Sequence, residues 1–133
     1  RIAYNILQKH VICEPNKIRI CINPEWINIK QKRNFDNRSN IPLFEHNVVK
    51  KNMYLFKNSL VASICDKNTF TEYLFYTPND GTVINTNKEL LTNINNIFEN
   101  KYSYPDMLDK LWIAELNIEN DYKKSNEWFS GYY

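Results

Sequence analysis

Histidine and cysteine are the residue types here with the widest chemical range, and their spacing argues against a catalytic or metal-binding role. The histidines, His10 and His46, are isolated, and neither has a second ligand at the short spacing of a zinc site. No Cys-x-x-Cys pair is present. His10 and Cys13 stand three positions apart in an expected strand, where their side chains point to opposite faces. They cannot form a base with its nucleophile, so no metal or cofactor is predicted.

Two pairs of carboxylates have a spacing that acid–base catalysis could use, Asp106 with Asp109 and Glu115 with Glu119. Both pairs stand among other scattered charges, which is typical of solvated surface acids. The chain has only two glycines, so it also lacks a glycine-rich loop for a phosphate group. The sequence therefore predicts a protein that is not an enzyme.

The three cysteines, Cys13, Cys21 and Cys65, cannot all pair within one chain. A four-residue loop between the first two strands would place Cys13 opposite Ile18, facing inward, and Cys21 opposite His10, facing outward. Three residue steps of about 3.3 Å would then separate Cys13 from Cys21 by roughly 10 Å, too far for a bond. We expect no Cys13–Cys21 disulfide and at most one intramolecular bridge. Three reduced, buried thiols in a cytosolic protein are the alternative.

The size and charge of the chain limit the classes of function that it can have. The 133 residues predict a single domain, with a core over 10–118 and a tail over 119–133. The net charge of +2 is dispersed, which disfavours nucleic-acid binding because that mode needs a concentrated basic stripe. No apolar run approaches the roughly 20 residues of a membrane span.

Two features bear on the compartment. Arg1 in first position is expected of a mature secreted chain or of a trimmed one. The triplet Asn37-Arg38-Ser39 is a glycosylation sequon, which would carry a glycan only in a secreted protein.

Alternation of apolar and polar residues predicts the elements that must position these side chains, and most of them are strands. The clearest strand is 17–22, whose three isoleucines face the core while Lys17, Arg19 and Cys21 face the other side. Further strands are expected at 11–13, 26–30, 53–56, 70–76, 82–86 and 112–118. Strands 53–56 and 70–76 are apolar on both faces, as central strands of a sandwich would be.

The rest of the chain reads as loops with room for one short helix. Residues 31–47 are polar and predict a long exposed loop. A helix is expected near 88–98, from a stripe of apolar residues, or near 105–110, where Pro105 and Asp106 can open a helical turn. Short strands separated by turn signals favour a mainly β fold, an antiparallel β-sandwich, over a barrel.

The C-terminal tail is aromatic and has two interpretations. It can pack over the end of the sandwich, or it can form an exposed patch that anchors a partner protein, since tyrosine and tryptophan are enriched in interfaces. Its candidate interface residues are Trp128, Phe129, Tyr132 and Tyr133.

The order of several motifs resembles the oocyte-secreted and placenta-specific protein family. Asn52-Met53-Tyr54-Leu55-Phe56 is similar to its first aromatic strand, and residues 60–65 are similar to the element that ends in a cysteine. Tyr73-Leu74-Phe75-Tyr76 is similar to the next strand, and Asp80-Gly81 stands where the family has Cys-Gly. Val11-Ile12-Cys13 before the strand at 18–22 resembles the opening of the family, and 112–118 with Lys124-Ser125-Asn126-Glu127-Trp128 resembles its end.

That family is similar to the N-terminal half of the zona pellucida module, ZP-N. The resemblance implies an immunoglobulin-like sandwich with two disulfides, the first cysteine bonded to the fourth and the second to the third. Cys13 and Cys65 match the first and second positions, whereas Asp80 and residues 117–119 stand at the other two. The fold would then rest on its apolar core, or Cys21 would supply a new bond.

The function implied is a secreted, non-enzymatic recognition or adhesion module of the reproductive or epithelial kind. It would bind another protein, with self-association as a further option, through an exposed edge strand or aromatic patch. The alternative is an intracellular viral or parasite interaction protein, because the richness in Asn, Ile and Lys is typical of an AT-rich genome.

Overall fold

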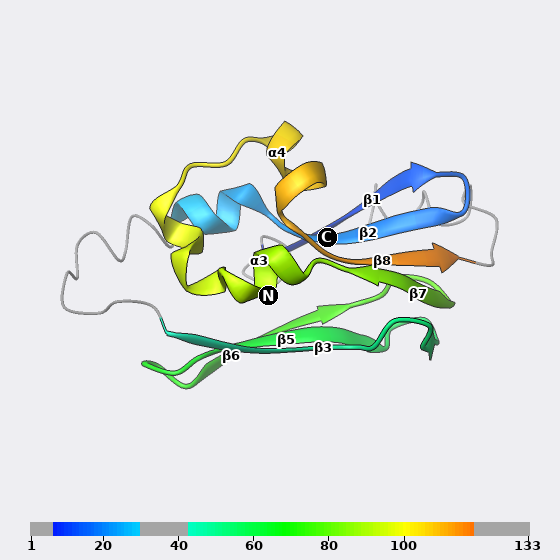
Figure 1. Ribbon diagram of the computed structural model, residues 1–133, viewed down its shortest axis with the longest axis horizontal. Coiled ribbons are helices and arrows are strands. Elements are labelled where there is room, and N and C mark those ends of the chain that lie inside the picture. Colours follow the sequence, from blue (N-terminus) through cyan, green and yellow to red (C-terminus); the bar gives the residue numbers. More distant parts are fainter. Residues whose placement is uncertain (1–6, 30–42, 119–133) are drawn as a thin grey trace.

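Two antiparallel β-sheets form the protein in the computed structural model, which describes residues 7–29 and 43–118. Figure 1 shows the sheets as two layers, with the three-stranded sheet beneath the five-stranded one. The five-stranded sheet consists, in spatial order, of β1 (Gln8–Glu14), β2 (Lys17–Ile22), β8 (Trp112–Ile118), β7 (Gly81–Thr86) and β4 (Tyr54–Leu55). The three-stranded sheet consists of β3 (Phe44–Val48), β5 (Leu60–Asp66) and β6 (Thr71–Tyr76). The expected mainly β, antiparallel sandwich is confirmed.

The core lies where the alternation of β2 and β8 predicts it. Ile18, Ile20 and Ile22 are completely buried, and Ala114 and Leu116 of β8 are equally inaccessible. Ile18 pairs with Leu116 and Ile20 with Ala114, so the buried side chains of the two strands form one apolar layer. The three-stranded sheet contributes mainly the side chains Val61, Ile64 and Phe75.

The β1–β2 hairpin is tighter than the sequence predicts, which changes the face of Cys13, and the burial of Cys21 also differs from the expectation. Ile12 pairs with Ile18 and Glu14 pairs with Lys17, so the turn is two residues long and Cys13 is left at a bulge. Cys13 is exposed and Cys21 is completely buried, so the predicted inward Cys13 and outward Cys21 are both wrong. A register that differs by one residue moves a side chain to the other face of the sheet.

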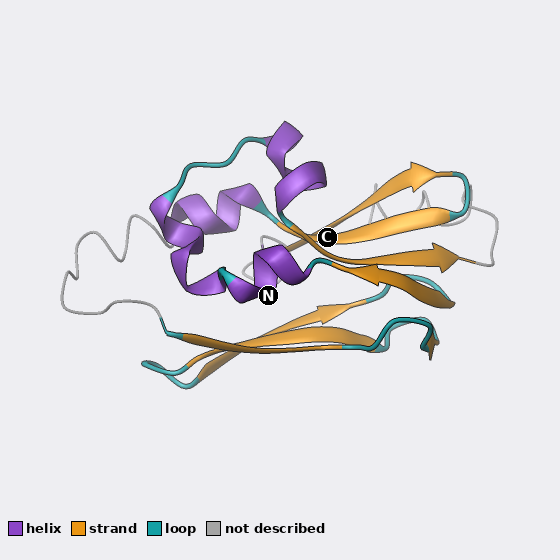
Figure 2. Cartoon of the chain, viewed as in Figure 1, coloured by secondary structure: helices purple, strands orange, loops and turns teal. Residues whose placement is uncertain are grey.

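Within 7–29 and 43–118, a group of short helical segments lies beside the five-stranded sheet, over one half of the three-stranded sheet (Figure 2). They are a helix over 24–29, α3 (Lys88–Thr92), the 3-10 helix η1 (Ile94–Glu99) and α4 (Tyr104–Lys110). Both segments at which a short helix was expected are helical. Aromatic contacts fasten this layer: Trp26 lies 5.1 Å from Tyr73 and 5.6 Å from Phe98, and Phe98 lies 5.8 Å from Phe44 between ring centroids.

The strand predicted at 26–30 is wrong, because residues 24–29 form a helix. Asn23 caps it: its side-chain oxygen accepts a hydrogen bond from the Glu25 backbone N–H at 3.1 Å, and its carbonyl accepts from the Trp26 N–H. Pro24 occupies the first helical position, where a missing N–H is harmless. The Asn-Pro pair is therefore a helix start, and the alternation that follows it is overridden.

The exposed loop predicted at 31–47 is wrong over its last part, which forms β3; residues 30–42 lie outside the described residues. The segments 53–56 and 70–76 are not central strands. β4 is the last strand of its sheet and β6 is an outer strand of the other, whereas the centre of that sheet is β5. Apolar residues at every position of a segment predict burial on both faces, but three of the four side chains of 53–56 are exposed and only Leu55 is buried.

Gly81 explains how β4 and β8 can flank β7 so closely. It pairs with Leu55 on one side and Ile118 on the other. A Cβ atom at Gly81 would lie 2.6 Å from the backbone oxygen of Asn117, so a side chain there would force the strands apart.

Candidate functional site

The three cysteines are free thiols, and none has the environment of a nucleophile. Burial raises the pKa of Cys21 to about 12, and partial burial also raises the pKa of Cys13, although Arg19 opposes that shift. Both side chains are thus protonated thiols at neutral pH, and a thiol attacks and binds metals only as the thiolate. Cys65 is half-buried on β5, opposite Glu45 and Glu72 of the flanking strands.

The two histidines have different environments. His10 is buried on β1, and burial, assisted by the charge of Lys9, lowers its pKa to about 4. His46 is exposed on the outer strand β3. Among residues 7–29 and 43–118, no group of three or more His, Cys, Asp or Glu side chains is arranged to hold a metal ion.

Two of the four carboxylates singled out from the sequence, Glu115 and Asp106, stabilise the structure. Glu115 accepts a hydrogen bond from Arg19 Nε at 2.9 Å, and Arg19 also donates to the Leu108 carbonyl and covers the Trp112 ring at 4.7 Å. This cluster fastens α4 to the outer face of the five-stranded sheet. Asp106 accepts hydrogen bonds from the Ser103 backbone N–H and hydroxyl, which lower its pKa and cap α4. Asp109 is exposed, and Glu119 lies outside the described residues.

The remaining sites predicted from the sequence also lie outside the described residues. They are the sequon asparagine Asn37 and the aromatic residues Trp128, Phe129, Tyr132 and Tyr133. In the described part of the chain, no helix is both long and apolar enough to cross a membrane.

Large apolar side chains gather instead along residues 53–60, where the chain crosses from one sheet to the other and back. We name Met53, Tyr54, Phe56 and Leu60 the β4 patch; all four are exposed, and Phe56 has 68% of its surface accessible. The Tyr54 and Phe56 rings contact each other edge to face, with 5.2 Å between centroids and 81° between planes. Leu55, between them, is buried and fixes the strand to the core.

The local backbone makes this segment rigid rather than a loose loop. The Val83 N–H donates to the Met53 carbonyl at 2.8 Å, and the Asn52 N–H donates to the Val83 carbonyl at 2.7 Å. Asn52 and Asn58 adopt positive φ angles of 73° and 70°, which asparagine tolerates better than most residues. The two exposed aromatic rings are therefore held in place by turns on both sides.

Lysines surround the β4 patch. Lys50 and Lys51 precede it and Lys57 lies within it, and all three are exposed. Asp80 accepts a hydrogen bond from the Lys57 backbone N–H. The patch therefore combines apolar surface with positive charge, which a chain-wide net charge of +2 conceals.

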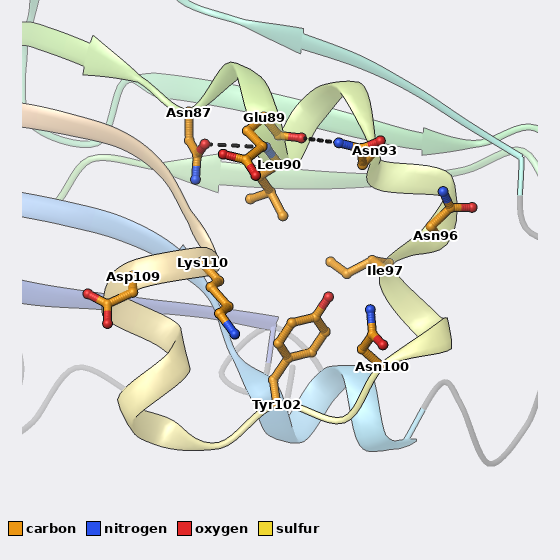
Figure 3. A pocket seen from close by; sticks show the side chains of 10 residues that line it. All are labelled: Asn87, Glu89, Leu90, Asn93, Asn96, Ile97, Asn100, Tyr102, Asp109 and Lys110. Atoms are coloured by element: carbon orange, nitrogen blue, oxygen red, sulfur yellow. Dashed lines mark hydrogen bonds between the residues drawn. The ribbon is translucent and has the colours of Figure 1, made fainter.

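A shallow pocket of about 260 Å³ lies on the helical layer, at a distance in sequence from the β4 patch. Its walls come from α3, η1, the segment after η1 and the end of α4 (Figure 3). Four of its ten lining residues are asparagines, Asn87, Asn93, Asn96 and Asn100. Sequence reasoning missed this pocket because its residues belong to three short elements that only the tertiary structure brings together.

No family model and no curated protein matches the sequence. Among solved structures, a glycine cleavage system H protein from Mycobacterium marinum is similar, with a TM-score of 0.53 over 88% of this chain and 84% of that chain. The sequence identity is 10%, so the likeness extends to the fold alone.

Proposed function

We propose that this chain is a non-enzymatic recognition module that binds a second protein through the β4 patch. One observation carries the proposal: the edge strand β4 and the residue that follows it present two aromatic rings, Tyr54 and Phe56, in mutual contact to solvent. Rigid, exposed aromatic side chains bury much area on binding and lose little conformational entropy. An outer strand can also add a strand from a partner through its backbone.

The partner that fits is an extended, acidic segment of another protein. The lysines at 50, 51 and 57 favour a partner with carboxylates around an apolar centre. The same charge disfavours self-association through this surface, because two copies would bring two basic rims together.

Selection from a library of displayed linear peptides tests the proposal. We expect enriched peptides in which acidic residues alternate with apolar ones, and binding that weakens with salt. The double variant Tyr54→Thr/Phe56→Thr should weaken binding by about tenfold or more. Tyr104→Thr is the matched control, since Tyr104 is exposed to a similar extent but lies on α4.

Three results would overturn the proposal. Selected peptides could bind the double variant as well as the parent, or be predominantly basic. The protein could instead bind phosphatidylserine vesicles through these residues while selecting no peptide, which would assign the patch to a membrane surface.

The compartment forms a second part of the proposal. The family resemblance supports a secreted module, in which Asn37 carries a glycan, while the free thiols are what an intracellular interaction protein would have. Mass spectrometry of the natural protein, with thiol labelling after unfolding without reductant, separates the two. A glycan supports secretion, whereas three labelled thiols and no glycan support the intracellular alternative.

A further inference from the structure

The pocket on the helical layer has polar groups whose orientation is fixed by hydrogen bonds within the protein. Asn87 Oδ1 accepts from the Leu90 backbone N–H at 3.3 Å, which leaves its Nδ2 group as a donor. Asn93 Nδ2 donates to the Glu89 carbonyl at 2.9 Å, which leaves its Oδ1 atom as an acceptor. Figure 3 shows both bonds along one rim of the pocket. A ligand here meets preoriented donors and acceptors in alternation, as a hydroxyl-rich molecule requires.

Charge on the opposite rim is largely compensated. Lys110 Nζ lies 3.8 Å from Asp106 Oδ1, so its positive charge already has a carboxylate beside it. The Asp109 carboxylate points away from the centre of the pocket in Figure 3. The Glu89 carboxylate on the α3 rim also lines the pocket, so an anionic ligand is disfavoured, whereas the hydroxyl groups of a neutral ligand can donate hydrogen bonds to it.

An apolar surface completes the pocket. Leu90 and Ile97 line it, and the Tyr102 side chain extends into it with its hydroxyl directed toward Ile97 (Figure 3). An aromatic ring beside hydrogen-bonding amides suits a molecule with C–H groups on one face and hydroxyls on its edge. The volume of about 260 Å³ lies below the roughly 300–1,000 Å³ of pockets for drug-sized ligands, so the ligand is about one ring in size.

We infer that this pocket binds a neutral monosaccharide unit, free or at the end of a glycan. None of its residues belongs to the β4 patch, so the inference stands or falls separately from the proposed protein-binding function.

Titration of the ¹⁵N-labelled protein with neutral methyl glycosides, followed by amide chemical shifts, tests the inference. Glucoside, galactoside, mannoside and N-acetylglucosaminide form the neutral series, and methyl glucuronide is the charged comparison. We expect saturable shifts within 87–110 for at least one neutral glycoside, with a dissociation constant on the order of 1 mM. Tyr102→Ala should weaken that binding by about tenfold, a loss near 1.4 kcal/mol.

Two further variants keep the test decisive. Asn96→Ala should also weaken binding, whereas Asn85→Ala, an exposed asparagine on β7, should not. The same spectra report whether each variant is folded. Absence of saturation by about 50 mM in the whole neutral series, shifts centred outside 87–110, or tighter binding of the glucuronide would overturn the inference.

Discussion

The two margins of the sandwich are built in opposite ways. At the first, β1 of one sheet meets β6 of the other, and Gln8 closes the gap: its Nε2 donates to the Tyr76 carbonyl at 2.7 Å, and its Oε1 accepts from the Tyr76 N–H at 3.0 Å. The Gln8 side chain thus pairs with the backbone of β6 as a neighbouring strand would. At the second margin, β4 contributes only two residues, and Tyr54 on it and Phe56 after it expose their aromatic rings.

The contrast shows what an unprotected edge signifies. Proteins usually block free strand edges, because unpaired backbone and apolar side chains invite association. This chain blocks the β1–β6 margin with a buried amide and leaves apolar surface at β4. We interpret the β1–β6 margin as a contribution to stability and the β4 margin as the proposed binding surface.

Protonation of His10 should destabilise the closed margin, and of the changes considered it should lower the free energy of unfolding the most. His10 lies on the same buried face of β1 as Gln8, and its pKa is about 4 in the folded protein against about 6.5 when unfolded. Because the folded state binds the proton less readily, its stability is complete above about pH 6.5 and falls as the pH drops toward 4. The loss at pH 4 is about 3 kcal/mol, measurable by urea unfolding at each pH.

Two variants isolate that contribution. His10→Leu should remove most of the pH dependence between pH 6.5 and 4, whereas His46→Gln, which changes an exposed histidine, should leave it as in the parent. An equal pH profile for the parent and His10→Leu would contradict the prediction.

Gln8→Ala should open the same margin with a smaller loss. It leaves the Tyr76 N–H and carbonyl without their partner at a half-buried position, and such groups lose about 1–3 kcal/mol when unsatisfied. We expect a decrease of about 2 kcal/mol in the free energy of unfolding in urea. Lys9→Ala, on the exposed face of the same strand, should change it by less than about 0.5 kcal/mol. An equal decrease in the free energy of unfolding for the two variants would mean that the Gln8 side chain does not stabilise this margin.

The closed margin could not be predicted from the sequence, whereas the layers that it joins could. The sequences of β2 and β8 alternate, and the predicted inward residues Ile18, Ile20, Ile22, Ala114 and Leu116 are buried, although Cys21 and Ile113 between them are buried too. Gln8 and Tyr76 are 68 positions apart, and nothing in either neighbourhood marks them as partners. Long-range polar contacts depend on the final packing and leave no periodic trace.

The apolar segment at the β4 margin is evident in the sequence, but the burial predicted for it is wrong. Met-Tyr-Leu-Phe is apolar at each position, which the periodicity argument assigns to a strand buried on both faces. The strand order places it at an edge, where Met53, Tyr54 and Phe56 are exposed and only Leu55 is buried. A local pattern reports how apolar a segment is, and only the topology decides whether the segment meets the core or a partner. The pocket on the helical layer could be predicted neither from a local apolar pattern nor from the strand order, since several short helices bring its residues together.

Phe70 is exposed, but it belongs to neither margin of the sandwich. It lies at the β5–β6 turn with a φ of 56° and 84% of its surface accessible. A bulky residue in the left-handed region is strained, and asparagine is not. Phe70→Asn should stabilise the protein by about 1 kcal/mol in urea unfolding and leave peptide binding unchanged. Lost binding in this variant would extend the interaction surface to the hairpin tip.

The double variant Tyr54→Thr/Phe56→Thr should have the smallest effect on stability and thereby separate binding from folding. Both rings are exposed, Leu55 between them keeps its place in the core, and threonine has the β-branched shape that strands favour. The contact between the two rings is lost, so the free energy of unfolding should fall by about 0.5 kcal/mol. Leu55→Thr is the contrasting control and should lose about 2 kcal/mol, because its side chain is buried. If the double variant is instead as unstable as Leu55→Thr, the rings at β4 support the fold, and their exposure gives no reason to expect a partner there.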